Sequence, residues 1–173
     1  MVAKVSVPAG SLAEGAGLSS VDDLTEAHPL YKLRTWVDRK LVSIWLNDNV
    51  WICGHRYTSV QSGFSQSVGT RRVPHDAIVR AMVLQAIYSP RDVADLIKRL
   101  HTQWVCRWFI GYHRHSAIWS SEEFHTLSQE LLESELYGDL FESLRELSED
   151  AEMFADPSFR VDTFLLARWA SYC

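Results

Sequence analysis

The chain has 173 residues, of which 47% are hydrophobic and 23% are charged, and its formal net charge is -5. These values are typical of a globular domain with a sizeable core. A general nucleic-acid binder usually carries a clear basic excess, so the acidic balance argues against that class. No apolar run approaches the roughly 18 residues that can span a membrane, so no membrane partner is expected.

The three cysteines, Cys53, Cys106 and Cys173, are far apart and form no CxxC pair. An odd number of widely separated cysteines favours reduced thiols in a cytoplasmic protein over a disulfide framework. Residues 1–28 lack the apolar core of a signal peptide and predict a flexible leader. The folded domain is therefore expected over residues 29–173.

The first predicted element is an amphipathic helix over residues 30–46. Its apolar residues recur at steps of three and four, which predicts a buried face formed by Leu30, Leu33, Val37, Leu41, Ile44 and Trp45. Residues 47–72 are rich in Gly, Ser and Asn and have no helical period. They predict a long irregular loop, in which only Val50–Cys53 resembles a strand.

A second helix is predicted to open at Pro74 and to continue to Tyr88, almost wholly apolar and therefore buried. Ser89 and Pro90 are expected to end it and to cap and open the next helix. That helix turns an apolar face inward, and Asp95 and Arg99 are expected to pair on its outer face. Its predicted inward residues are Val93, Leu96, Ile97 and Leu100.

The remaining elements are also predicted to be helices. A short aromatic helix ends at Gly111, and another begins after Ser120 or Ser121, with acidic residues in its first turn. Two more follow over residues 136–147 and 158–170. The sequence therefore predicts one all-α domain, a bundle of about six to seven helices.

Four stretches carry a resemblance to a known family: HPLYKLRTWVD, VPHDAIVRAMVLQAIYSPRDVADLI, RWFIGY and IWSSEEFHTLSQEL. They are similar to the N-terminal helical domain of IS5/IS1182-type bacterial transposases, over about residues 29–147. The resemblance implies a helical fold and descent from a module that binds duplex DNA. In that family an RNase H-like catalytic domain follows, and a chain without it is not expected to perform transposition.

The stretch from Trp119 onward departs from the family pattern. The family has a proline where this chain has Trp119, a serine and a threonine where it has Glu122 and Glu123, and then several arginines. From residue 121 to residue 152 this chain has many acids and a single base, Arg145. Since DNA affinity depends largely on Lys and Arg contacts to phosphates, we expect this chain to have lost the DNA-binding affinity of the family.

Three groups of residues are candidates for a site. Arg71, Arg72 and His75 precede a helix and could bind an anion, or could form a solvated basic corner. Glu122 and Glu123 could provide one inward general acid/base, or could stabilise the first helical turn. The catalytic candidates are Glu122, Glu123 and His75; the substrate-binding candidates are Arg71, Arg72, His55, Trp104, Trp108, Trp119 and Tyr112.

Other chemistry-bearing residues give weaker signals. His113 and His115 have no third ligand nearby, so no metal and no cofactor are expected. Cys106 is interpreted as a packed thiol and Arg107 as a structural arginine tied to the bundle. The seven tryptophans fit either a large aromatic core or an aromatic-lined pocket.

Three functions remain open at this point. The first is a repurposed transposase-like domain that binds a small aromatic, carboxylate-bearing metabolite and condenses or cyclises it by acid/base catalysis, as a biosynthetic enzyme. The second is a remnant DNA-binding module with the cluster Arg71, Arg72, Arg80, Lys98 and Arg99. The third is a non-catalytic interaction protein, such as a homodimer through apolar helices. The charge pattern favours the first.

Overall fold

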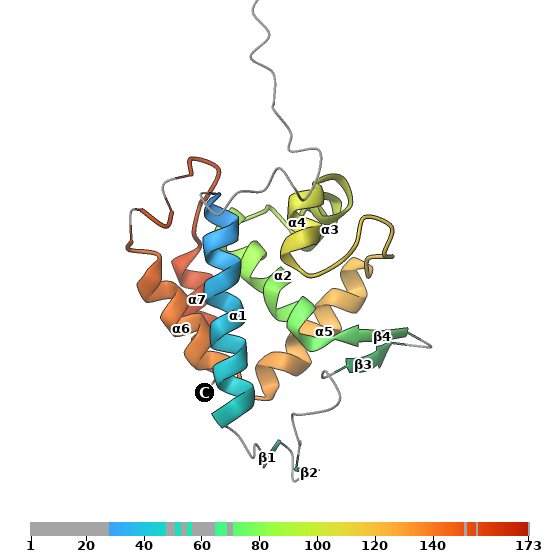
Figure 1. Ribbon diagram of the computed structural model, residues 1–173. Coiled ribbons are helices and arrows are strands. Elements are labelled where there is room, and N and C mark those ends of the chain that lie inside the picture. The colour runs from blue at the N-terminus through green and yellow to red at the C-terminus, as the bar shows by residue number, and fades with distance from the viewer. Residues whose placement is uncertain are drawn as a thin grey trace, which may run out of the picture.

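The computed structural model describes residues 28–47, 51–52, 55–56, 65–68, 71–150, 152–154 and 156–172. This part forms an all-α bundle of seven helices, as predicted (Figure 1). Of residues 45–72, only the backbone of the helix end and of four short strands is described. The predicted leader, residues 1–28, lies outside the described residues except for His28.

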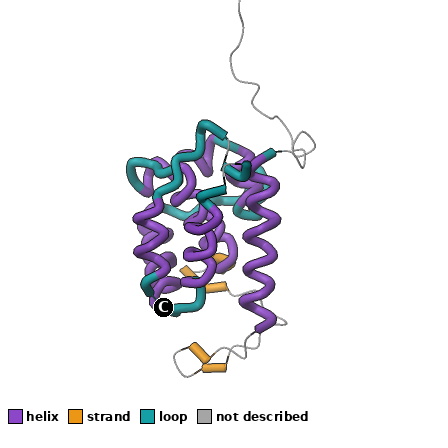
Figure 2. The backbone as a smooth tube through the Cα atoms, turned by 90° about the vertical axis from the view of Figure 1, so that its left-hand side faces the viewer, coloured by secondary structure: helices purple, strands orange, loops and turns teal. Residues whose placement is uncertain are grey.

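Helix α1 spans Pro29–Asn47, and the view turned by 90° shows it along one side of the bundle (Figure 2). Its predicted inward residues Leu30, Leu33, Val37 and Leu41 are fully buried, and Ile44 is half-buried. The side chain of Trp45 lies outside the described residues. The apolar stripe therefore fixes which face of α1 remains exposed.

Two short antiparallel strand pairs follow in the segment predicted to be an irregular loop. β1 (Trp51–Ile52) pairs with β2 (His55–Arg56), and β3 (Ser65–Val68) pairs with β4 (Arg71–Pro74). The strand expected at Val50–Cys53 is confirmed for its two central residues, whereas β2, β3 and β4 were not predicted. The β3 sequence, SQSV, has no clear alternation of apolar and polar residues to reveal such a strand.

Helix α2 (His75–Tyr88) is the central helix of the bundle. Ten of its fourteen residues are buried, and it packs against α1, α3, α4, α5 and α7. It begins one residue after Pro74, which ends β4 in an extended conformation. The near-continuous apolar sequence of α2 is explained by neighbours on most of its sides.

Helix α3 (Val93–Thr102) begins later than predicted. Ser89 adopts φ 43° and ends α2 as a left-handed C-cap, whereas the Asp92 side chain accepts a hydrogen bond from Asp95 N at 2.8 Å and caps α3. Asp95–Arg99 is not among the ion pairs of the described residues, and the Arg99 guanidinium lies 5.2 Å from the Tyr88 ring centroid. Arg99 therefore packs on an aromatic ring instead of an acid.

Helix α4 (Trp104–Phe109) ends before Gly111, which has φ +84° as a C-terminal glycine should. Arg107 is only 7% exposed and donates to the carbonyl oxygens of Leu100 (3.4 Å), His113 (3.1 Å) and Ser116. Its prediction as a structural arginine is confirmed. One guanidinium thus ties the end of α3 to the turn that follows α4.

The last three helices are α5 (Ser121–Glu133), α6 (Gly138–Leu147) and α7 (Thr163–Ala170). α6 and α7 pack closely on each other. The segment before α7 crosses to the end of α2, where Arg160 N donates to Ile87 O at 2.7 Å and Asp162 N donates to Ala86 O at 2.8 Å. The C-terminal helices are therefore part of the same bundle.

Candidate functional site

An open hollow of about 490 Å³ lies on the exposed face of α1 and is the candidate site. Its lining residues are Tyr31, Lys32, Thr35, Trp36 and Arg39 from α1, with Met153 from the C-terminal half of the chain. The α1 residues are spaced by one, three or four positions, so they form one continuous surface of the helix. The hollow, hereafter the α1 hollow, combines two aromatic rings with two cationic side chains.

The cations of the α1 hollow are accessible to a ligand. Lys32 has a side-chain exposure of 44%, and Arg39 is exposed. A third cation, Lys40 Nζ, lies 5.7 Å from the ring centroid of Trp36 and donates to Ser143 Oγ at 3.0 Å. The aromatic surface of Trp36 is therefore flanked by positive charge.

The opposite wall of the α1 hollow is a tight turn near Met153. Asp150 Oδ1 accepts hydrogen bonds from Glu152 N (2.9 Å) and Met153 N (3.3 Å) and so shapes the turn. Glu152, 86% exposed in its side chain, pairs with Lys32 at 3.3 Å. The turn thus brings an apolar side chain and one carboxylate to the edge of the hollow.

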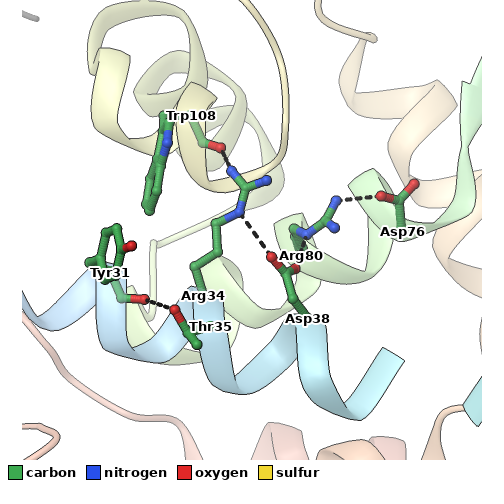
Figure 3. Close-up of polar contacts among 7 residues, drawn as sticks. All are labelled: Tyr31, Arg34, Thr35, Asp38, Asp76, Arg80 and Trp108. Carbon is green, nitrogen blue, oxygen red and sulfur yellow. Dashed lines mark hydrogen bonds and ion pairs between the residues drawn. The ribbon is translucent and has the colours of Figure 1, made fainter. Parts of the chain in front are cut away.

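The Tyr31 wall is supported from behind by helix α4 (Figure 3). The Tyr31 and Trp108 rings stack with centroids 5.9 Å apart and planes inclined by 14°. The Arg34 guanidinium lies 4.8 Å from the Trp108 ring centroid and donates to the Trp108 carbonyl oxygen. Trp108, a predicted substrate-binding residue, therefore positions a wall of the α1 hollow and does not line it.

Beneath this wall lies the paired-arginine junction, made of Arg34, Asp38, Asp76 and Arg80 (Figure 3). Asp38 accepts from Arg34 Nε at 3.4 Å and from Arg80 Nε at 2.9 Å, and Arg80 also pairs with Asp76. Burial, followed by the neighbouring charge of Arg80, lowers the pKa of Arg34 from its ordinary value. Two arginines and two aspartates balance here, so the junction fixes α1 against α2 without net charge.

Gly111 lies against both arginines of the junction. Its φ of +84° is strained for other residues, and a Cβ there would lie 3.4 Å from Arg80 Nη1 and 3.8 Å from Arg34 Nη2. The α4 end thus contacts both guanidinium groups at a residue without a side chain. The sequence identified Gly111 as a helix end, but its proximity to the two arginines depends on the packing of three helices.

The predicted acid/base candidates lie elsewhere. Glu122 is exposed in the first turn of α5. Glu123 completes a capping box: Ser120 N donates to Glu123 Oε2 at 2.6 Å, and Glu123 N donates to Ser120 Oγ at 3.1 Å. His75 is half-buried at the start of α2, and burial lowers its pKa although Asp76 opposes the shift. None of the three lines the α1 hollow.

The remaining predicted binding residues that the structure describes do not line the α1 hollow. Trp119 is 1% exposed and packs between Tyr112 (centroids 5.1 Å apart, T-shaped) and Phe124 (6.4 Å, stacked). Trp104 is half-buried in the first turn of α4. The predicted anion-site side chains of Arg71 and Arg72, and that of His55, lie outside the described residues.

The lining residues of the α1 hollow were missed at the sequence level. Lys32, Thr35, Trp36 and Arg39 occupy the face opposite the buried leucines, and their spacing of three and four was a usable signal. A tryptophan among cations on the polar face of a helix is unusual, because large aromatic side chains usually pack inward. The part played by Met153 depends on a contact between residues about 120 positions apart and left no local signal.

The described residues offer neither a cluster of metal ligands nor a reactive thiol. They contain no group of three His, Cys, Asp or Glu side chains that could hold a metal ion, and both His113 and His115 are exposed. Cys106 is buried, and desolvation raises the pKa of its thiol to about 12. Its prediction as a packed thiol is confirmed, since a nucleophilic cysteine needs a lowered pKa.

Comparisons with protein-family models, curated proteins and solved structures gave no match for this chain. The resemblance to transposase N-terminal domains stays a prediction. No helix of the described part is long and apolar enough to cross a membrane.

Proposed function

We propose that this chain binds a small aromatic molecule that carries a carboxylate, and that the α1 hollow is the binding site. The observation that supports this proposal is the meeting of Tyr31 and Trp36 with Lys32 and Arg39 on one open surface. Ligand sites are typically apolar and aromatic with a few placed polar groups, which is the composition of this hollow. No cofactor is required for binding.

Three of the lining residues have distinct roles in this proposal. The ligand ring stacks on Trp36, whose exposed surroundings already attract the Lys40 ammonium. Arg39 presents a planar guanidinium that can hold a carboxylate with two hydrogen bonds, and Lys32 adds a second charge. Exposed ion pairs contribute only about 0.2–1 kcal/mol each, so we expect a dissociation constant of roughly 0.1–1 mM.

We propose binding at the α1 hollow, without the condensation or cyclisation that was predicted from the sequence. Glu152 is the carboxylate at the edge of the hollow in the described structure, and it is paired with Lys32. Glu122, Glu123 and His75 are not among the lining residues. An acid/base step at this site would therefore need a group that the ligand itself supplies, and we propose no reaction.

The DNA-binding alternative has less support from the geometry. Of its five predicted bases, Arg80 is 8% exposed and paired with Asp38 and Asp76, and Arg99 packs on Tyr88. Buried and paired arginines cannot neutralise phosphates without losing those contacts. The homodimer alternative would use exposed apolar residues such as Phe164 (88% exposed) and Val42 (46%), and isolated exposed residues of this kind are common on monomers.

The test is an isothermal titration of the full chain with indole-3-carboxylate and, as matched control ligand, indole. We expect the acid to bind and indole to bind at least threefold more weakly. Lys32→Met and Arg39→Gln should each weaken binding of the acid about threefold, because each removes an ion pair of about 0.7 kcal/mol. Arg168→Gln, an exposed base on α7, is the control variant and should bind like the wild type.

Two results decide against this site. Loss of binding in Arg72→Ala with normal binding in Lys32→Met would move the ligand to the anion site predicted before helix α2. Salt-sensitive binding to a DNA duplex, with no response to either indole compound, would support the remnant DNA-binding module instead.

A further inference from the structure

A second charged surface lies far along the chain from the α1 hollow. Residues 96–121 contain four Lys and Arg residues and three of the chain's seven histidines, and not one Asp or Glu. The exposed members, hereafter the basic corner, are Lys98, His101, His113, Arg114 and His115. In a chain with a net charge of -5, such a stretch is a local reversal of the overall charge.

The fold brings the two parts of the basic corner together. Arg107 donates to the carbonyl oxygen of Leu100, next to His101, and to those of His113 and Ser116 in the turn after α4. Since one guanidinium reaches all three acceptors, the end of α3 and the 113–116 turn are neighbours in the fold. In Figure 1 the connection from α4 to α5 runs beside α3 and α4.

The backbone of the basic corner is held at several points. Ser116 N donates to His113 O at 3.0 Å and closes the turn, and Tyr112 N donates to Arg107 O at 2.9 Å. Gly111 reverses the chain at the end of α4 with its positive φ. The site is thus preorganised, which lowers the entropy lost when a ligand binds.

Acidic groups of the packed elements flank the basic corner. On α3, Asp95 is one turn before Lys98 and lies about 9 Å from His101 along the helix axis at 1.5 Å per residue. Glu123 on α5 is engaged in its capping box, which leaves Glu122 as the nearest exposed acid along the chain after the corner. The titratable and charged groups of the elements around the corner are Asp92, Asp95, Lys98, Arg99 and His101 on α3, Cys106 and Arg107 on α4, and Glu122, Glu123, His125, Glu130 and Glu133 on α5.

We propose that the basic corner binds a small anion bearing several phosphate charges. Lys98 supplies an ammonium group, and His101, His113 and His115 supply imidazole N–H groups on the same exposed surface. Phosphate oxygens accept hydrogen bonds from side chains of these kinds. This inference does not rest on the α1 hollow.

The probe is inorganic triphosphate, titrated into the full chain at constant pH and constant ionic strength. We expect the wild type to bind, and the triple variant with His101→Gln, His113→Gln and His115→Gln to bind about tenfold more weakly. Lys98→Gln should also weaken binding, and the exposed matched controls His125→Gln and Arg160→Gln should leave it unchanged.

The outcomes separate the two proposals. Lys32→Met should bind triphosphate normally, so a failed α1 hollow leaves this result intact. No binding by the wild type, or binding that the triple variant retains in full, overturns the proposal. A parallel sedimentation assay with vesicles containing phosphatidylinositol phosphates assigns the source: co-sedimentation that the triple variant loses indicates a lipid headgroup, whereas binding of triphosphate alone indicates a soluble phosphate compound.

Discussion

The buried arginines of this bundle contact carboxylates in one region and backbone carbonyl oxygens in another. At the paired-arginine junction, Arg34 and Arg80 meet the carboxylates of Asp38 and Asp76, so the region is close to neutral. At the basic corner, Arg107 meets backbone carbonyl oxygens and no acid occurs between residues 96 and 121. The first arrangement fixes helices against one another, whereas the second fixes a loop and leaves positive charge for a ligand.

The largest predicted effect is at the basic corner. Arg107→Met should lower the free energy of unfolding by about 3 kcal/mol, because buried carbonyl oxygens lose charge-assisted hydrogen bonds. Urea denaturation measures it, with Arg168→Met on the exposed face of α7 as a control expected within about 0.5 kcal/mol of the wild type. A loss below about 1 kcal/mol would mean that Arg107 does not hold the turn in place.

A smaller loss is expected at the paired-arginine junction. Arg80→Met should cost about 2 kcal/mol, since Asp38 (39% exposed) and Asp76 (27% exposed) can be solvated once the guanidinium is gone. A double-mutant cycle with Asp38→Asn should give a coupling energy of about 0.5–1.5 kcal/mol. Strict additivity of the two changes would show that the pair contributes nothing.

Gly111 joins the two regions, because it follows α4 and lies against both junction arginines. Gly111→Ala should destabilise the fold by about 1–2 kcal/mol, chiefly through its positive φ. Thermal unfolding of Gly111→Ala beside Ala117→Gly, an exposed position in the same connection, checks this. An unchanged melting temperature for Gly111→Ala would contradict the left-handed turn.

Protonation of His75, which lies beside the paired-arginine junction, should make the stability of the fold depend on pH. Burial lowers the pKa of His75 beside the junction, so the unfolded chain takes up a proton at higher pH than the folded chain. Stability is then unaffected by His75 above the ordinary histidine pKa and falls as the pH drops from there toward the lowered value. His75→Gln should reduce the acid-induced loss measured by urea denaturation from pH 7.5 to pH 5, and the exposed His125→Gln should not.

The smallest effect concerns the edge of the α1 hollow. Glu152→Gln should raise the affinity for indole-3-carboxylate about twofold, because it frees Lys32 from an exposed ion pair. Glu149→Gln, another exposed acid of the same part of the chain, is the matched control. Equal gains in both variants would point to a general charge effect and not to competition for Lys32.

The helices could be predicted from the sequence because their signals are local. Leucine spacing defined the inner face of α1, Gly111 marked the end of α4, and Ser120 with Glu123 marked the start of α5. The start of α3 was predicted wrongly, because Ser89 and Asp92 are both good caps by sequence. Only the left-handed conformation of Ser89, set by the direction of the chain after α2, decides between them.

The candidate site was harder to predict because its parts come from distant segments. Trp119 and Glu123 were predicted site residues, yet Trp119 packs in the core and Glu123 takes part in the capping of its own helix. Trp36 is one of seven tryptophans in the sequence, and it is half-buried at the edge of the core, on the side of α1 that lines the hollow. The closeness of Met153 to Trp36 depends on how the segment after α6 returns to α1, which no local pattern encodes.

The most direct test of the α1 hollow is a proton–nitrogen NMR titration that follows the seven tryptophan indole signals as indole-3-carboxylate is added. Trp36→Phe identifies the Trp36 signal by its loss. The account predicts that the Trp36 signal moves first and saturates, with a smaller shift of Trp108 behind Tyr31 and none of the buried Trp119. Shifts confined to Trp104 or Trp119, or no saturable shift at all, would contradict it.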